Sequence, residues 1–262
     1  MSAKKYVFIV CPNQAGSTVI YRYLGRCEKA VKLGSEGQLL YGDAGPINML
    51  GEVSEEYFSF YPEVFSNDAK YDWNRIKRAW ENNWRQEARN QKKKDPCVFI
   101  EKSPPNVFRA HLLQRHFENS YFIFSIRNPY AMCEGMKRHI GYPVEKGAEH
   151  WARCARMQVL NIYEFANQKR NVMLFYKYED LCSNPERVKE DIVSLIPELS
   201  DLNLGKNIAV HSINDMAGMR EKKLSNLNEK QFKNLSQEDA DKITAVLKNY
   251  KDEMEIFNYD YR

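Results

Sequence analysis

The sequence predicts a single α/β domain over residues 1–262, with a central parallel sheet flanked by helices and a P-loop-like turn after the first strand. Short apolar runs, rich in β-branched and aromatic residues, recur as in strands that are covered on both faces. Helical patterns separate these runs, which is typical of a parallel sheet wound with crossover helices. A glycine-containing turn joins the first run to the first helical pattern, as a phosphate-binding loop does.

Four apolar runs are predicted to form the buried strands of the sheet. Each is nearly continuous in apolar character rather than alternating, which favours burial on both faces. The predicted strands are Tyr6–Cys11, Cys97–Glu101, Tyr121–Arg127 and Asn171–Tyr178.

Helical patterns follow each of these strands. Pro129 stands at a favoured first-turn position of one helix, and Ser236 is a suitable N-terminal cap for the last. The predicted helices are Thr18–Ala30, Pro105–Phe117, Pro129–His139, about Lys146–Gln168, one opened by Asn184-Pro185, and Ser236–Tyr250.

An unusually long stretch, Val31–Asp95, lies between the first two predicted strands. Apolar residues recur within it at helical spacing, which predicts one helix face packed on the core. Long insertions in α/β domains often form the variable part of a site, so this helical insertion is also a candidate lid or substrate wall. The residues of the predicted face are Trp73, Ile76, Trp80, Trp84 and Ala88.

The composition limits the partners of the chain. The net charge of +4 is too small for a nucleic-acid coat, but it allows a local basic pocket for an anionic ligand. The six cysteines are scattered without a CxxC pair, as buried free thiols are. Neither a signal peptide nor an apolar run of about 20 residues is present, so we expect no membrane span and a cytoplasmic protein.

The ends of the predicted strands indicate where a ligand would bind. In open α/β sheets, ligands bind outside the carboxyl ends of the strands. Four polar segments occupy those positions: the CPNQAGST loop, Lys102-Ser103-Pro104, Arg127-Asn128-Pro129 and Tyr178-Glu179-Asp180.

The CPNQAGST loop has the residues of an anion site. Gly16 lets the backbone approach a ligand, Ser17 and Thr18 offer hydroxyl groups, and the start of the following helix exposes backbone N–H donors. A nucleoside-triphosphate loop, GxxxxGK[ST], would carry a lysine where Ser17 stands, which disfavours a P-loop kinase. A simple helix cap is the alternative interpretation of this turn.

The basic side chains at the other strand ends also have two interpretations. Lys102 ends a buried strand, where an ammonium group needs a pocket or a partner, unless it extends to solvent. Arg127 is suited to bidentate contact with a phosphate, or it pairs with a carboxylate that shapes the turn.

The order of these segments resembles the sulfotransferases, and in particular their bacterial and Golgi-type branch. The likeness lies in Ala-Gly-Ser-Thr after the first strand, then Glu-Lys-Ser-Pro, Arg-Asn-Pro and Tyr-Glu-Asp-Leu with a following Asn-Pro, and extends from Lys5 to about Ile196. The resemblance implies a sulfotransferase fold and the use of 3′-phosphoadenosine 5′-phosphosulfate (PAPS), without a metal. It also implies an acceptor hydroxyl or amine on a small molecule or saccharide.

The same resemblance implies a role for individual residues. The loop would hold the 5′-phosphosulfate end of PAPS, through Asn13, Gln14, Ala15, Gly16, Ser17 and Thr18. Arg127 would hold the 3′-phosphate, Tyr178 would lie near the adenine or that phosphate, and Lys102 would sit beside the transferred sulfuryl group. Arg220 is similar to an element that binds the 3′-phosphate in cytosolic members.

Two positions depart from the family's pattern. Gln14 stands where the family has a cation that stabilises the leaving group, and Gly135 stands where it has a serine that contacts the 3′-phosphate. The first departure removes a charge and the second removes one hydroxyl contact. They motivate an alternative function, a nucleotide-binding protein with little or no catalytic activity.

The general base of the transfer has several candidates. Members of this branch often use a glutamate after the first helix, and Glu36 is the nearest such residue. It could equally be an ordinary loop acid. His139 and His150 are further candidates, although a lone histidine is more often structural.

Overall fold

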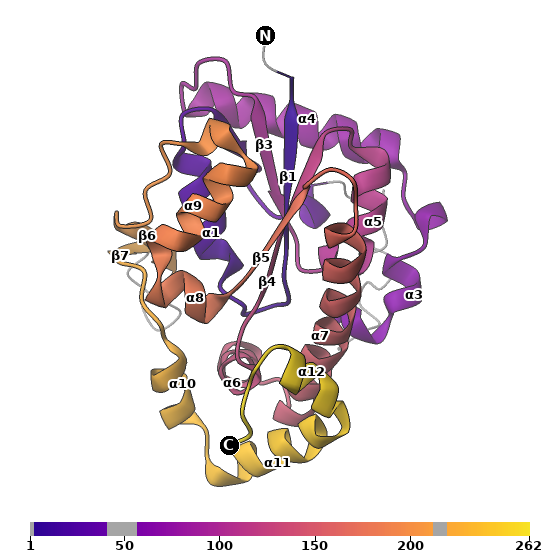
Figure 1. Ribbon diagram of the computed structural model, residues 1–262, viewed down its shortest axis with the longest axis vertical. Helices are drawn as coiled ribbons and strands as arrows, with labels where there is room; N and C mark the ends of the chain where they lie inside the picture. The colour runs from indigo at the N-terminus through magenta and orange to yellow at the C-terminus, as the bar shows by residue number, and fades with distance from the viewer. Residues whose placement is uncertain (1–2, 41–56, 212–218) are drawn as a thin grey trace.

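The structure is a computed structural model, which describes residues 3–40, 57–211 and 219–262, while the side chains of 209–220 and 222 lie outside that description. Within these ranges, five parallel strands form one sheet in the order β2-β3-β1-β4-β5, shown in Figure 1. The predicted α/β class and central parallel sheet are therefore confirmed. The order places β1 in the middle, so the loop that follows it opens at the centre of the carboxyl edge.

The four predicted strands all form, and each of their ends differs from the prediction by one or two residues. They are β1 (Lys5–Val10), β3 (Val98–Lys102), β4 (Ser120–Ile126) and β5 (Met173–Lys177). The edge strand β2 (Ala30–Lys32), paired with β3, was not predicted. Three residues carry too little periodic signal to be recognised.

Alternating residues of β1 face two separate parts of the core. Val7 and Ile9 belong to one apolar cluster and Phe8 and Val10 to the other, and all four are fully buried. This alternation explains the continuous apolar run, because each face of the strand meets its own layer of helices.

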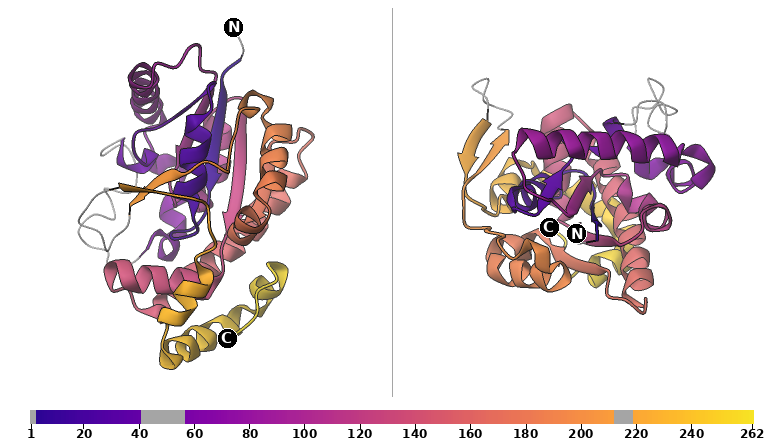
Figure 2. Two further views of the ribbon diagram at one scale, coloured as in Figure 1. Left: turned by 90° about the vertical axis from the view of Figure 1, so that its left-hand side faces the viewer. Right: turned by 90° about the horizontal axis from the view of Figure 1, so that it is seen from above.

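Helices α1 and α9 pack on the face that carries Val7 and Ile9, α4 and α5 pack on the opposite face, and the long helix α7 contributes buried residues to both clusters. Seen from above, α4 and α9 lie at opposite sides of the molecule (Figure 2). The bounds of these helices are α1 (Ser17–Arg26), α4 (Trp73–Asn90), α5 (Asn106–His116), α7 (Val144–Ala166) and α9 (Pro185–Leu195).

The described part of the insertion is mostly helical and packs on the core. Helix α4 buries Trp73, Ile76, Trp80 and Trp84 as predicted, and Ala88 is partly buried against the same cluster. The other short elements are η1 (Gly37–Leu39), η4 (Phe58–Phe60), α3 (Pro62–Phe65) and η5 (Asp68–Lys70).

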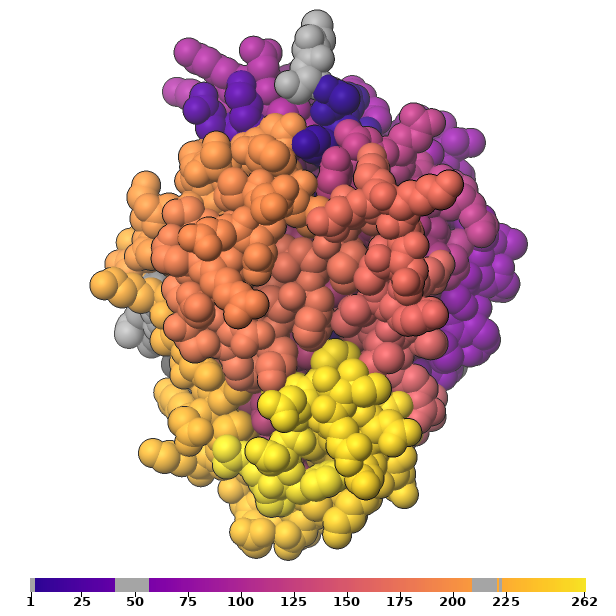
Figure 3. All heavy atoms as spheres, viewed as in Figure 1, coloured from indigo at the N-terminus to yellow at the C-terminus, as the bar shows by residue number. Residues whose placement is uncertain are grey.

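A last group of helices lies beyond the carboxyl edge of the sheet, at the lower end of Figure 1. In the space-filling view of Figure 3, the C-terminal helices cover the lower part of the face that is turned towards the viewer. These helices are α6 (Pro129–Ile140), α10 (Asn228–Asn234), α11 (Gln237–Leu247) with η7 (Lys248–Tyr250), and α12 (Lys251–Ile256), while the short helix α8 (Tyr178–Ser183) directly follows β5. The remaining elements are η6 (Pro197–Leu199) and the antiparallel pair β6 (Ile208–His211) and β7 (Met219–Lys222).

One expected helix end was wrong, and helix α8 was not predicted. The first helix ends at Arg26 rather than Ala30, because the chain turns at Cys27 and enters β2. The segment after the fourth strand begins α8 at Tyr178 itself, where the Asp180 carboxylate accepts a hydrogen bond from the Lys177 backbone N–H. Helix α10 had no counterpart among the predicted elements.

Candidate active site

The loop after β1 has a backbone that only particular residues allow. Gln14 and Gly16 both adopt positive φ, 58° and 83°. A Cβ atom on Gly16 would lie 2.5 Å from the ring of Tyr178, so glycine is required here both by conformation and by space. The strand-end tyrosine thereby fixes the path of the loop.

The start of α1 is suited to receive an anion. Gly16 is its N-cap and provides no side-chain capping bond, and no acidic residue lies in the first turn. Backbone N–H groups at such an end remain available to a ligand, and the helix dipole favours negative charge there. In the same loop, the buried Asn13 amide oxygen has no partner among the described residues, which is costly unless a ligand satisfies it.

Lys102 and Glu36 form an ion pair beside this loop. The Lys102 ammonium donates to Glu36 Oε1, and the lysine side chain is 8% exposed against 28% for the glutamate. Lys102 is aligned with Ile9 of β1, two residues before the loop begins. The structure thus brings together the two residues that the sequence suggested for catalysis, although 66 positions separate them.

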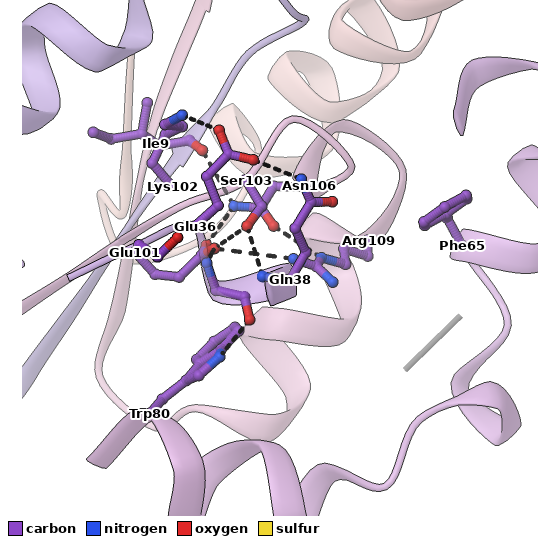
Figure 4. A network of polar contacts seen from close by, with 12 residues as sticks. Ile9, Glu36, Gln38, Phe65, Trp80, Glu101, Lys102, Ser103, Asn106 and Arg109 are labelled. Carbon is purple, nitrogen blue, oxygen red and sulfur yellow. Dashed lines mark hydrogen bonds and ion pairs between the residues drawn. The ribbon is translucent and has the colours of Figure 1, made fainter. Parts of the chain in front are cut away.

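Glu36 is held in place by a polar network under the end of β3 (Figure 4). Its centre is Glu101, which is fully buried. Glu101 Oε2 accepts a hydrogen bond from Asn106 Nδ2 at 2.6 Å, and Oε1 accepts from the Ser103 hydroxyl and the Gly37 backbone N–H. The pKa of Glu101 is raised, because burial raises it by more than Arg109, 4.0 Å away, lowers it.

The loop that carries Glu36 is packed from two sides at Gly37. Trp80 Nε1 donates to the Gly37 carbonyl at 3.0 Å, while Glu101 accepts from its N–H. A Cβ atom at Gly37 would lie 2.5 Å from Glu101 Oε1 and 2.6 Å from the Trp80 ring. Gln38 Nε2 also donates to Glu36 Oε2 at 2.6 Å, which fixes the second carboxylate oxygen.

Arg127 lies on the other side of the loop and is 5% exposed. Its Nη1 donates to the Gln14 carbonyl at 3.1 Å, and its guanidinium stacks on the Tyr178 ring at 4.0 Å. Burial lowers the pKa of Arg127, but arginine remains charged at neutral pH. Burial also raises the pKa of Tyr178 to about 12, so the phenol is neutral. Arg127, Tyr178 and the loop therefore form one packed unit.

Asn228 and Gln231 of α10 complete the surroundings of Arg127. Arg127 Nε donates to Asn228 Oδ1 at 2.8 Å, and Nη2 donates to Gln231 Oε1. Sequence reasoning missed both residues, because a seven-residue polar helix has no periodic signal and no spacing that points to Arg127. It also missed Glu101. The only sign of this residue's role in the sequence is that an acidic residue lies within an otherwise apolar strand.

The two departures from the family's pattern are in contact. A Cβ atom at Gly135 would lie 3.2 Å from Gln14 Oε1 and 3.3 Å from Gln231 Nε2. The Gln14 side chain therefore lies towards α6, in the space beside residue 135. The missing cation and the missing serine are one structural feature rather than two.

The two candidate histidines are not part of this cluster. His150 is fully buried, accepts or donates a 2.7 Å hydrogen bond with Ser59 Oγ, and has its pKa lowered by burial to about 3. It is a neutral core residue that cannot reach an acceptor. His139 lies in the last turn of α6. Arg220 lies in β7, but its side chain is outside the described part of the chain.

Comparisons with known proteins identify the family of the chain. Residues 7–196 match the model of the sulfotransferase family. The match covers more than half of the chain, so the chain belongs to the sulfotransferase family. A search of curated proteins finds no match.

Solved structures share the fold at low sequence identity. The sulfotransferase domain of the Synechococcus PCC 7002 olefin synthase has a TM-score of 0.58 and 19% identity, over 100% of this chain and 98% of that one. The sulfotransferase domain of the curacin biosynthetic pathway has a TM-score of 0.55 and 16% identity, over 100% of both chains. A sulfotransferase from Alicyclobacillus acidocaldarius has a TM-score of 0.52 and 11% identity, over 99% and 98%.

No helix in the described ranges combines the length and the apolar character needed to cross a bilayer.

Proposed function

We propose that the chain transfers a sulfuryl group from PAPS to a hydroxyl or amine of a small molecule or saccharide. Membership of the sulfotransferase family supports the reaction class. The observation that carries the proposal is the Lys102–Glu36 ion pair beside the loop of β1. A cation and a carboxylate side by side at this position would suit a transferred group and its acceptor.

The residues of the loop fit the 5′ end of the nucleotide. The open start of α1 can hold an anion there. The unsatisfied Asn13 Oδ1 is an acceptor, so it would take a hydrogen bond from a donor group of the ligand, such as a hydroxyl. At the 3′ end the fit is incomplete, because Arg127 is present but already bonded to α10. Gly135 has no hydroxyl to offer, and the side chains of Gln14 and Gln231 lie beside it.

PAPS, when bound, supplies the sulfuryl group and a phosphate leaving group. Lys102 provides positive charge beside the loop, which stabilises negative charge that develops on the leaving oxygen. Glu36 takes the proton from the acceptor oxygen or nitrogen as the new bond to sulfur forms and the bond to the phosphate oxygen breaks. The ion pair holds the Glu36 carboxylate beside Lys102 before the acceptor arrives.

The test is a comparison of Lys102→Met with the wild type. We expect the variant to bind 3′-phosphoadenosine 5′-phosphate (PAP) with little change but to lose sulfuryl transfer by about a hundredfold or more, because a donor at a developing charge is removed. Calorimetry gives the binding and labelled PAPS with a panel of acceptors gives the transfer. Lys5→Met is the control, since Lys5 pairs with Glu198 at the amino end of β1.

Each outcome separates the candidate functions. Absence of PAP binding by the wild type would remove the proposal altogether. PAP binding without transfer to any acceptor would favour the alternative of a nucleotide-binding protein that lacks catalysis, which the uncharged Gln14 motivates. Tighter binding of ATP with Mg²⁺ than of PAP would instead favour a P-loop kinase.

A further inference from the structure

The edge of Arg127 that is suited to a phosphate is occupied by the protein itself. Nε donates to Asn228 Oδ1 at 2.8 Å and Nη2 donates to Gln231 Oε1. These two nitrogens form the fork with which arginine grips two oxygens of one phosphate or carboxylate. Two neutral amide oxygens from α10 therefore stand where two oxygens of an anion would bind.

The orientation of both amides is determined by their neighbours. Asn228 Nδ2 donates to Glu179 Oε1 at 2.6 Å, and Gln231 Nε2 donates to Glu134 Oε2 at 2.8 Å. Turning either amide over would place its oxygen against a carboxylate and its NH₂ group against a guanidinium. The amide oxygens thus face Arg127 for an electrostatic reason, and both hydrogens of Gln231 Nε2 are already donated, one to Glu134 and one to the Ala131 carbonyl at 2.8 Å.

The carboxylates that hold the amides are themselves well anchored. Burial acts to raise the pKa of Glu134, but hydrogen bonds from Arg138, Asn234 and Gln231 outweigh it and lower the pKa. Glu179 accepts further hydrogen bonds from the Asn128 N–H at 3.0 Å and the Tyr259 hydroxyl at 2.8 Å. Glu134 therefore remains ionised at neutral pH, and the hydrogen bonds to both acids keep the amide nitrogens engaged.

The surroundings of these contacts are buried and closely packed. Asn228 and Gln231 are 5% and 6% exposed, and the Tyr178 ring covers one face of the guanidinium. The space next to Gly135 is bordered by Gln14 and Gln231. A phosphate can reach the Nε–Nη2 edge only if at least one amide leaves it.

We propose that Asn228 and Gln231 are a self-ligand of Arg127, which the 3′-phosphate of a bound nucleotide must displace and which thereby sets the affinity for that phosphate. The inference rests on the proposed function, because it takes Arg127 as the 3′-phosphate site. Hydrogen bonds to an ionised acceptor are about twice as strong as those to a neutral one, so a phosphate prevails over the amides. The displaced amides lower the affinity, and a nucleotide without a 3′-phosphate leaves them in place.

The test compares PAP with 5′-AMP, which lacks the 3′-phosphate, by calorimetry on the wild type and on Gln231→Met. Methionine keeps the length and apolar body of the side chain but cannot compete for Arg127. We expect the Kd for PAP to fall about tenfold, since one bond to a charged group no longer has to be broken, and the Kd for 5′-AMP to stay within about twofold.

Asn234→Ala is the matched control. Asn234 lies on the same helix and donates to Glu134 Oε1 at 2.9 Å, but its hydrogen bond is not to Arg127. We expect its PAP to 5′-AMP affinity ratio to equal that of the wild type. If Gln231→Met has the same PAP to 5′-AMP affinity ratio as the wild type, the self-ligand proposal is overturned. If Gln231→Met binds PAP more weakly than the wild type, Gln231 is instead itself a phosphate ligand.

A second measurement uses the unaltered chain. Hydrogen–deuterium exchange of residues 228–234 should become faster with PAP than with 5′-AMP, because only PAP removes the amides from Arg127. Slower exchange with PAP would contradict the proposal. If neither the wild type nor any variant binds PAP, the proposed function fails and the self-ligand falls with it. If PAP binds normally but neither the affinity of Gln231→Met nor the hydrogen exchange changes as expected, the self-ligand proposal is overturned and the proposed function is not.

Discussion

At the scale of single residues, Gln14 and Gly135 depend on one another. The sequence presents them as separate departures from the family's pattern, 121 positions apart by their numbering. The structure places the Gln14 side chain next to the position that a Cβ of residue 135 would take, at 3.2 Å from Oε1. A larger residue at position 135 would therefore require the Gln14 side chain to move.

This contact predicts an interaction energy between the two sites. Gly135→Ser should be more favourable in a Gln14→Ala background than in the wild type by about 0.5–1 kcal/mol, because the crowding is removed. Urea unfolding of the two single variants and the double variant measures this coupling. Gly147→Ser is a control, since a Cβ there meets Cys133 Sγ at an ordinary 3.4 Å. Strict additivity in the cycle would mean that Gln14 and Gly135 do not interact.

At the scale of structural elements, the loop after β2 wraps around the end of β3. Glu101 and Lys102 point to opposite faces of the strand, as neighbours in a strand do. Gly37 lies against Glu101 on one face, and Glu36 reaches Lys102 on the other. Trp80 of α4 supports the loop from the side of the insertion. Helix α4 of the insertion thus holds in place the loop that carries Glu36.

Substituting Gly37 should dislodge this loop. In Gly37→Ala the new methyl group meets Glu101 and Trp80, which are both fully buried and cannot withdraw. We expect the free energy of unfolding to fall by about 1–3 kcal/mol, as for other overpacked sites. PAP binding should persist, because the loop after β1 is untouched, while sulfuryl transfer should fall with the loss of the Glu36 contact.

Gly34→Ala is the control for this prediction. Gly34 lies in the same loop, but a Cβ there meets the end of the Glu87 side chain, at 3.0 Å, which can move aside, and Asn83 Nδ2 at an ordinary 3.7 Å. Equal losses of stability and transfer in the two variants would indicate that any change in the loop is harmful. The particular contact with Glu101 and Trp80 would then not be responsible.

At the scale of the whole molecule, a buried histidine connects stability to pH. His150 of α7 packs against the rings of Tyr57 and Phe58 and bonds to Ser59. Its folded pKa of about 3 lies below the ordinary value of 6.5. As the pH falls below 6.5, the unfolded chain takes up a proton that the folded chain does not, so the folded state is progressively disfavoured.

The resulting prediction is a loss of stability in mild acid. Between pH 7.5 and pH 5, His150 should lower the free energy of unfolding by about 2 kcal/mol, at 1.4 kcal/mol per pH unit below its unfolded pKa. His150→Gln should remove that part of the pH dependence. Urea unfolding at the two pH values measures it, and an unchanged slope in the variant would refute the assignment.

Long, strongly patterned elements could be predicted from the sequence. Four of the five strands of the sheet, the helix face of Trp73, Ile76, Trp80 and Trp84, and the loop after β1 all follow from local periodicity and turn chemistry. Short elements could not. The edge strand β2 and the helix α10 have too few residues to show a period, and packing rather than propensity defines them.

The sequence by itself determined the sheet, the position of the loop at its carboxyl edge and membership of the sulfotransferase family, because these depend on local patterns and on the order of motifs. Only the tertiary structure decided which polar side chains meet. It paired Glu36 with Lys102, placed Gln14 beside Gly135 and put two amides of α10 on Arg127. Such contacts join segments far apart in the chain, and the packing of elements, rather than the spacing of residues, brings them together.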